Sequence, residues 1–289
     1  MNDIVYRDYD QAALDAQYNA RGAVPAFDAF VRRWREASDQ AIRDLPCSLD
    51  IPYGDDPVER LDIFHPLDGG PAPVLMFFHG GYWRAGDKSW FRYLARPFVE
   101  RGAAVVMPKY GLCPNFEMDT LVDQCRRAVA WTYREGPAHG IDTARLFISG
   151  HSAGGHIAGM MLATEWIAMG LPANMIKGMT GISGLYDLEP IRLSKANEPL
   201  SLTEDSARRN SPILRVQPAP PPNAILAYGA LESDEYGRQT AAYADLLGHA
   251  GRAPIILGVE GHHHFSVLDA FGNPRHDFGR AVLAQMGLA

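Results

Sequence analysis

The segment Gly150-His151-Ser152-Ala153-Gly154 constrains the fold of this chain more than any other. It matches the pattern G-x-S-x-G, in which a serine lies on a sharp turn between a strand and a helix. The neighbours of the serine must be small because the strand and the helix approach each other closely there. An apolar run typical of a strand precedes the segment at 145–149, and a run typical of a buried helix follows it at 155–163. The sequence therefore predicts a turn that presents Ser152 as a nucleophile.

Strand and helix patterns alternate on both sides of this turn. The strands are expected at 47–54, 59–66, 74–78, 103–107, 145–149, 176–183, 224–228 and 254–259. The helices are expected at 88–101, 117–135, 155–163, 236–250 and 276–287. Regular alternation of this kind produces a parallel sheet. The predicted fold class is therefore α/β, with a central, mostly parallel sheet of about eight strands flanked by helices.

The length and composition favour one domain over the whole chain, 1–289. A chain of 289 residues with 47% hydrophobic residues buries a large core, and α/β folds of this size commonly form a single unit. Residues 1–45 are predicted to form an amphipathic helical arm ahead of the sheet. Residues 188–222 break the alternation with prolines that include Pro218 and Pro220-Pro221-Pro222, and we expect them to form a small cap over the active site.

Charge and cysteine content exclude several classes of protein. The formal net charge of -7 provides no basic face for nucleic acid or for an anionic membrane. The three cysteines, Cys47, Cys113 and Cys125, show no C-x-x-C spacing, which is typical of free thiols in a reducing compartment. The first residues lack a signal peptide pattern, and no run approaches the roughly 18 apolar residues of a membrane span. We expect a cytoplasmic protein whose partner is a small-molecule substrate, and the sequence leaves its oligomeric state open, a homo-oligomer included.

A nucleophilic serine also needs N–H groups that stabilise the negative charge developing on the substrate oxygen. The segment His79-Gly80-Gly81-Tyr82-Trp83 follows a predicted strand directly, and its glycines let the backbone approach a substrate closely. We expect the donors to be the N–H groups of Gly81, Tyr82 and Ala153. Gly80 is the alternative to Tyr82, and the sequence does not decide between them.

The general base is expected in the segment Gly261-His262-His263-His264-Phe265, which follows the last predicted strand. Consecutive histidines do not readily present three ligands to one ion, so we predict no metal site here. His264 is the expected base because it lies just before Phe265 and the start of a helix. His262 and His263 are then residues of the loop.

The acid that orients the base is expected after the strand at 224–228. The loop that follows contains several carboxylates, and Glu232 lies three residues after Gly229, the usual position for this acid. Asp234 is the alternative. The resulting chain order of donor loop, serine, acid and histidine is that of an α/β-hydrolase.

Several of these segments resemble the kynurenine formamidases (arylformamidases), a branch of the α/β-hydrolases near the hormone-sensitive-lipase-like esterases. The donor loop and the following Gly86-Asp87-Lys88-Ser89 closely resemble the corresponding loop of that family. Glu232-Ser233-Asp234-Glu235-Tyr236 looks like its acid loop, and His264-Phe265 matches its His-Phe pair. The resemblance extends from about residue 74 to 270. One departure is Glu232, where animal members are expected to carry aspartate.

The resemblance implies a serine hydrolase that removes a small acyl group through an acyl-enzyme and needs no cofactor. Its implied substrate is an aryl formamide of the N-formylkynurenine type. The aromatic residues Tyr82, Trp83 and Phe265 are predicted to contact such a substrate. The first alternative is a carboxylesterase that acts on short-chain acyl esters with the same residues. A more remote alternative is a noncatalytic binding protein on the same fold.

Overall fold

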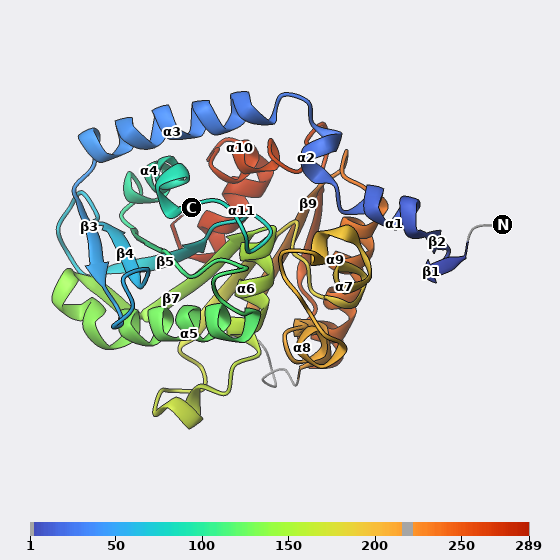
Figure 1. The fold of residues 1–289 in the computed structure, drawn as a ribbon. Helices are drawn as coiled ribbons and strands as arrows, with labels where there is room; N and C mark the ends of the chain where they lie inside the picture. Colours follow the sequence, from blue (N-terminus) through green and yellow to red (C-terminus); the bar gives the residue numbers. More distant parts are fainter. Residues whose placement is uncertain (1–2, 216–221, 289) are drawn as a thin grey trace.

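The computed structural model describes residues 3–215 and 222–288 and contains an eight-stranded sheet, shown in Figure 1. The strands are β3 (Cys47–Pro52), β4 (Arg60–Phe64), β5 (Ala72–Phe78), β6 (Ala104–Pro108), β7 (Ile141–His151), β8 (Ile176–Ile182), β9 (Asn223–Gly229) and β10 (Ile255–Val259). Their spatial order is β10-β9-β8-β7-β5-β6-β4-β3. Strands β5 to β10 pair in parallel, whereas β3 and β4 pair antiparallel at one edge. The predicted α/β fold class is confirmed.

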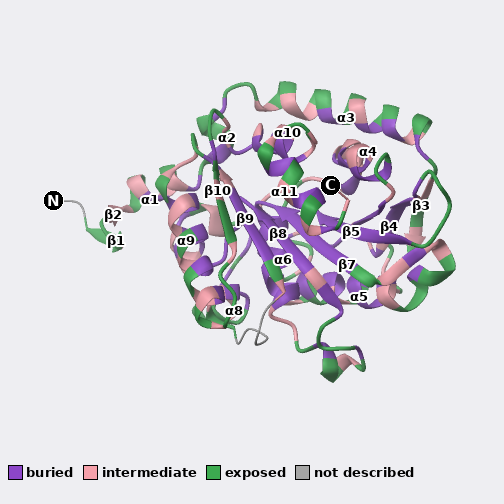
Figure 2. Cartoon of the chain, turned by 180° about the vertical axis from the view of Figure 1, so that it is seen from behind, coloured by how far each residue is buried: buried purple, intermediate pink, exposed green. Residues whose placement is uncertain are grey.

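Helices cover both faces of this sheet. They are α3 (Phe27–Asp44), α4 (Arg96–Val99), α5 (Met118–Glu135), η3 (Gly136–His139), α6 (Ala153–Leu162), α9 (Asp234–His249), α10 (Val267–Phe271) and α11 (Asp277–Gln285), and the short helix η4 (Trp166–Met169) lies in the loop after α6. Every residue of β5 is buried, and successive side chains enter opposite halves of the core. Val74 and Met76 pack on the side of α5, α6 and α9, whereas Leu75 and Phe77 pack on the side of α3, α4, α10 and α11. Figure 2 shows the central strands buried between these layers.

The segment expected to form one helix at 88–101 is instead broken, so that prediction is wrong. It forms η1 (Lys88–Trp90), η2 (Arg92–Ala95) and α4. Pro97 lies in the first turn of α4, where its missing N–H is not needed. In the interior of a longer helix, the same proline would remove a hydrogen bond and clash with the carbonyl four residues earlier. The proline therefore starts a helix here rather than continuing one.

The N-terminal arm is helical only in part. Its first described elements are the strands β1 (Ile4–Tyr6) and β2 (Tyr9–Asp10), which pair antiparallel as a separate two-stranded sheet. The helical prediction did not include this ribbon, whose turn places Arg7 in the left-handed region at a φ of 52°. The helices α1 (Gln11–Gln17), α2 (Ala20–Ala23) and α3 follow. In Figure 1 the arm runs along the edge of the molecule from the N-terminus to β3.

The proline-rich insertion forms short helices between β8 and β9. They are α7 (Glu189–Leu193), η5 (Lys195–Asn197), α8 (Glu204–Arg209) and η6 (Pro212–Leu214). Pro218, Pro220 and Pro221 lie outside the described residues. Within residues 3–215 and 222–288, no helix is both long enough and apolar enough to span a bilayer.

Candidate active site

Ser152 lies on the sharp turn between β7 and α6, the arrangement that its motif predicts. Its φ of 57° places it in the left-handed region, which is strained for a residue other than glycine. A Cβ atom at Gly150 would overlap the carbonyl group of Gly154, and one at Gly154 would overlap the carbonyl oxygen of Phe78. The Ser152 N–H donates to the Ile182 carbonyl at 2.8 Å. The backbone around the serine is therefore fixed by close packing.

The structure brings His264 and Glu232 together from the loops after β10 and β9. The distance from His264 Nδ1 to Glu232 Oε2 is 2.7 Å, and the two side chains are only 6% and 1% exposed. Glu232 Oε1 accepts from the Ser183 hydroxyl at 2.5 Å and from the Gly229 N–H at 2.6 Å. With Nδ1–H donating to the carboxylate, the other ring nitrogen of His264 keeps its lone pair. Glu232 is thus positioned to fix the tautomer of a base.

Ser183 was missed in the sequence analysis, although a signal for it exists. It directly follows the end of β8, between the strands that precede Ser152 and Glu232. Polar residues at the carboxyl ends of neighbouring parallel strands meet at one edge of the sheet. A serine at that position could have been considered a partner of the acid.

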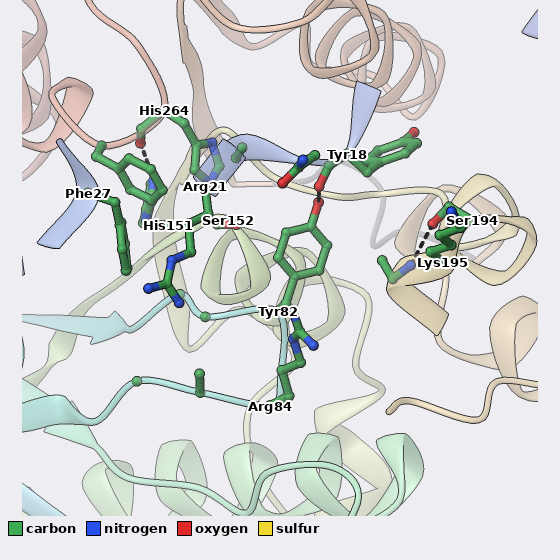
Figure 3. Close-up of a pocket in the computed structure, with 18 of the residues that line it drawn as sticks. Tyr18, Arg21, Phe27, Tyr82, Arg84, His151, Ser152, Ser194, Lys195 and His264 are labelled. Atoms are coloured by element: carbon green, nitrogen blue, oxygen red, sulfur yellow. Dashed lines mark hydrogen bonds between the residues drawn. The ribbon is translucent and has the colours of Figure 1, made fainter. Parts of the chain in front are cut away.

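Ser152 and His264 both line one cavity, as Figure 3 shows. In the described part of the chain, the Ser152 hydroxyl has no hydrogen-bond partner. Catalytic hydrogen bonds of this kind are often formed or shortened only when the substrate binds. The hydroxyl is therefore available to a group in the cavity.

His151 fixes the backbone of His264. Complete burial, and secondarily the nearby His264, hold the pKa of His151 well below its usual value, so its ring is neutral. Its Nε2–H donates to the His264 carbonyl at 2.7 Å. The residue before the nucleophile thus holds the residue that carries the candidate base.

The loop after β5 contains three consecutive residues in the left-handed region. The φ angles are 131° at Gly81, 51° at Tyr82 and 53° at Trp83. Among the described residues, no acceptor receives the N–H groups of Gly81, Tyr82 or Ala153. We call residues 79–83 the donor loop, because the free N–H groups of Gly81 and Tyr82 are able to donate hydrogen bonds to a substrate oxygen.

Side-chain hydrogen bonds of Tyr82 and Trp83 help to hold the donor loop in place. The Tyr82 hydroxyl donates to the Tyr18 carbonyl of the N-terminal arm at 2.5 Å. The Trp83 indole N–H donates to His156 Nδ1 at 3.1 Å. His156 Nε2 in turn donates to the Asn210 carbonyl at 2.6 Å, and burial lowers the pKa of His156 to about 4. The loop is thereby connected to the arm, to α6 and to the segment that follows α8.

Trp83 does not line the cavity, so its prediction as a substrate contact is wrong. Its side chain is 0% exposed, because the indole packs edge-on against His156 in the core. Tyr82 and Phe265, the other two predicted contacts, do line the cavity. The tryptophan supports the donor loop from behind.

The alternatives within the two loops have other contacts. His264 is paired with Glu232, and Asp234 begins helix α9. His262 Nδ1 contacts the Ser266 carbonyl at 2.8 Å, and His263 Nδ1 accepts from the Phe265 N–H at 3.2 Å. Both histidines therefore stabilise the loop itself.

The cavity has a volume of about 660 Å³ and is closed by segments far apart in the sequence. Aromatic side chains supply one part of its wall: Phe27, Trp34, Trp90, Phe91 and Phe265. Charged side chains supply another: Asp15, Arg21, Arg84 and Lys195. These residues come from the arm, the segment that follows the donor loop, η5 and the loop after β10. The size and mixed lining suit a small aromatic molecule with polar groups.

Comparisons with known proteins agree with this description. A family profile of the alpha/beta hydrolase fold matches residues 75–215. Kynurenine formamidase of Danio rerio is 33% identical over 265 residues, which cover 90% of this chain and 88% of that protein. Kynurenine formamidase of Salmo salar is 29% identical over 98% of both chains. A crystal structure of a protein from Silicibacter sp., proposed to be a thioesterase, superposes with a TM-score of 0.80 at 28% identity and covers 95% of this chain and 98% of that one.

Proposed function

The chain belongs to the kynurenine formamidase branch of the α/β-hydrolases, and from this premise we propose that it hydrolyses aryl formamides through a serine nucleophile. N-formylkynurenine is the representative substrate. The observation that supports this most strongly is the 2.7 Å contact between His264 and Glu232 at the cavity that Ser152 also lines. A noncatalytic binding protein has no need of this arrangement.

In the proposed mechanism, the Ser152 hydroxyl attacks the formyl carbon of the substrate. His264 accepts the serine proton at Nε2 as the new C–O bond forms. Glu232 stays ionised, accepts from Nδ1–H and stabilises the positive charge on the imidazole. Serine alone is a poor nucleophile near neutral pH, so the reaction depends on this proton transfer.

The negative charge of the tetrahedral intermediate falls on the former formyl oxygen. We assign its stabilisation to the N–H groups of Gly81, Tyr82 and Ala153, with Gly80 as the alternative to Tyr82. This assignment is supported because the N–H groups of Gly81, Tyr82 and Ala153 each lack an acceptor within the described residues. Loss of one such donor typically lowers the rate by about a hundredfold or more.

His264 then returns the proton to the departing aryl amine, and the C–N bond breaks to leave a formyl ester on Ser152. Water attacks this ester with His264 again as the base, which releases formate and restores the serine. The aromatic part of the cavity wall, which includes Phe27 and Phe265, accommodates the aryl group.

The decisive experiment compares kcat/KM for N-formyl-L-kynurenine with kcat/KM for p-nitrophenyl acetate and p-nitrophenyl butyrate. The proposal predicts that the formamide is the better substrate and that Ser152→Ala abolishes its turnover. A strong preference for the esters would replace the proposal with a short-chain carboxylesterase.

A matched pair of variants tests the assignment of the acid. Glu232→Gln should lose most of the activity, whereas Asp234→Asn should retain it, because His264 contacts Glu232. Loss of activity in Asp234→Asn alone would show that the acid is misassigned.

A further inference from the structure

The wall of the catalytic cavity has the opposite charge to the protein as a whole. The chain has a net charge of -7, yet three cations line the cavity beside a single noncatalytic carboxylate. The cations are Arg21, Arg84 and Lys195, and the carboxylate is Asp15. A cleft of one sign in a protein of the other sign attracts ligands of the protein's own sign. The cavity therefore favours an anion.

Arg84 is the cation whose charge is least compensated. Within the residues that the structure describes, its guanidinium forms no ion pair and no side-chain hydrogen bond. Its backbone is nevertheless fixed, since its N–H donates to the Gly81 carbonyl at 3.1 Å. It thus presents a free guanidinium beside the donor loop, and Figure 3 shows its side chain at the cavity.

The other two cations each have a partner. Arg21 forms an ion pair with Asp28 at 3.2 Å and lies over the ring of Phe27 at 4.8 Å. Lys195 Nζ lies 3.7 Å from Asp15. In Figure 3, Arg21 comes from the arm and Lys195 from η5, so they approach the cavity from other sides than Arg84. Arg21 and Lys195 contribute to the positive electrostatic potential of the cavity, while Arg84 remains free to bind a ligand.

A free guanidinium matches a carboxylate well. It has five N–H donors in a planar fork, which bind both carboxylate oxygens at once. The aromatic part of the wall suits an aryl ring, so a ligand that fills both regions has a ring and an acidic group.

We propose that Arg84, with Lys195 and Arg21, forms an anion-binding rim that selects substrates whose aryl amine bears a carboxylate. This inference rests on the proposed function, because it concerns the leaving group of the same reaction. The rim binds the carboxylate of the substrate's amino acid group and so places the formyl group next to Ser152.

Binding to the inactive Ser152→Ala protein tests the rim without any turnover. The probes are L-kynurenine and 2-aminoacetophenone, which share the ring and the ketone but differ in the amino acid group. When Arg84→Gln is added, the Kd of L-kynurenine should rise by a factor that is about five to ten times larger than the factor for 2-aminoacetophenone. Arg84→Lys should restore part of the difference, since it restores the charge but not the fork.

Salt dependence gives a second measurement. Raising the ionic strength to about 0.5 M should weaken binding of L-kynurenine in the Ser152→Ala protein and have a smaller effect once Arg84→Gln is added. Arg32→Gln is the matched control, because Arg32 is exposed on α3 and does not line the cavity. It should leave both affinities unchanged.

The proposed rim would be overturned if Arg84→Gln lowered the affinity for both probes equally. It would also be overturned if the affinity for L-kynurenine did not depend on ionic strength. Hydrolysis of N-formyl-L-kynurenine by the active protein judges the proposed function separately. Charge-dependent binding without hydrolysis would overturn only the proposed function. Hydrolysis with charge-independent binding would overturn only the rim.

Discussion

Two strained segments lie next to each other at the candidate active site, and they are held in different ways. In the turn at residues 150–154, which we call the nucleophile turn, Ser152 has a positive φ, and close backbone packing around Gly150 and Gly154 enforces this conformation. In the donor loop, Tyr82 and Trp83 also have positive φ, but their side chains are bound to distant residues. The first segment is fixed by close backbone packing against the central strands, and the second by side-chain hydrogen bonds to residues 64 and 73 positions away.

This difference shows that the two halves of the site depend on different parts of the molecule. Backbone strain of this kind costs about 1–3 kcal/mol per residue and persists only where the surroundings enforce it. The nucleophile turn obtains that support from the centre of the sheet. The donor loop obtains it from the arm and from α6, so a change in either should alter the loop before it alters the turn.

The largest expected effect comes from breaking the nucleophile turn with Gly154→Ala. The new methyl group would overlap the Phe78 carbonyl oxygen, a backbone atom that cannot move aside. We expect a loss of about 3 kcal/mol or more in the free energy of unfolding, and a near-complete loss of activity. Gly70→Ala is the matched control, because a Cβ atom there meets no heavy atom within 4 Å. Wild-type thermal stability in Gly154→Ala would show that packing does not fix the turn.

The second prediction concerns the pH dependence of the support behind the donor loop. Burial lowers the pKa of His156 to about 4, so the unfolded chain binds this proton more readily than the folded chain. The contribution of the neutral His156 to the free energy of unfolding is fully present above about pH 6.5 and is lost as the pH falls toward 4. The wild-type free energy of unfolding should decrease over this range by about 3 kcal/mol more than that of His156→Gln.

Chemical denaturation at a series of pH values measures this difference. His249→Gln is the control, since His249 is exposed and should leave the wild-type pH dependence intact. The same slope in wild type and in His156→Gln would contradict the role of a buried neutral His156.

The third prediction removes the hydrogen bond of Trp83 while it keeps an aromatic ring. Trp83→Phe leaves His156 Nδ1 buried without a donor, which should destabilise the protein by about 1–3 kcal/mol. We also expect kcat to fall at least tenfold with little change in KM, because the N–H donors that we propose would act on the transition state. Trp131→Phe, on α5 and away from the cavity, is the control. Unchanged kcat would mean that the loop needs no support from α6.

The smallest effect is expected for the bond to the arm. Tyr82→Phe removes only the hydroxyl that reaches the Tyr18 carbonyl, a loss of about 1 kcal/mol. Activity on the formamide should fall about three- to tenfold. Tyr133→Phe provides a matched loss of a hydroxyl on α5. An effect larger than that of Trp83→Phe would reverse the order of the two supports.

The nucleophile turn and the sheet could be predicted because their causes are local. Gly150, Ser152 and Gly154 lie within one segment, and the strands carry continuous apolar runs. The same applies to Glu232, whose spacing from Gly229 alone selected the residue that contacts His264. Short-range spacing was sufficient in each case.

The remaining features depend on contacts that spacing does not reveal. The sequence predicts Trp83 as a substrate contact, since an indole beside a glycine pair gives the same pattern whether it faces a ligand or the core, and its partner His156 is 73 residues away. Ser183 is absent from the predicted site because its acceptor Glu232 is 49 residues further along the chain. The broken helix is different, because its cause, Pro97, is local and is visible in the sequence.

The N-terminal arm has its own small sheet and takes no part in the large one, yet it closes the cavity with residues such as Asp15, Arg21 and Phe27. Part of the wall of the binding space is therefore encoded in a stretch of the gene separate from the stretches that encode the candidate catalytic loops. Exchanging the whole arm, residues 1–45, between homologous hydrolases would give chimeras that keep the same catalytic residues and have a different cavity wall. Substrate range could thus diverge in evolution, or be redesigned in the laboratory, without any substitution in the catalytic loops.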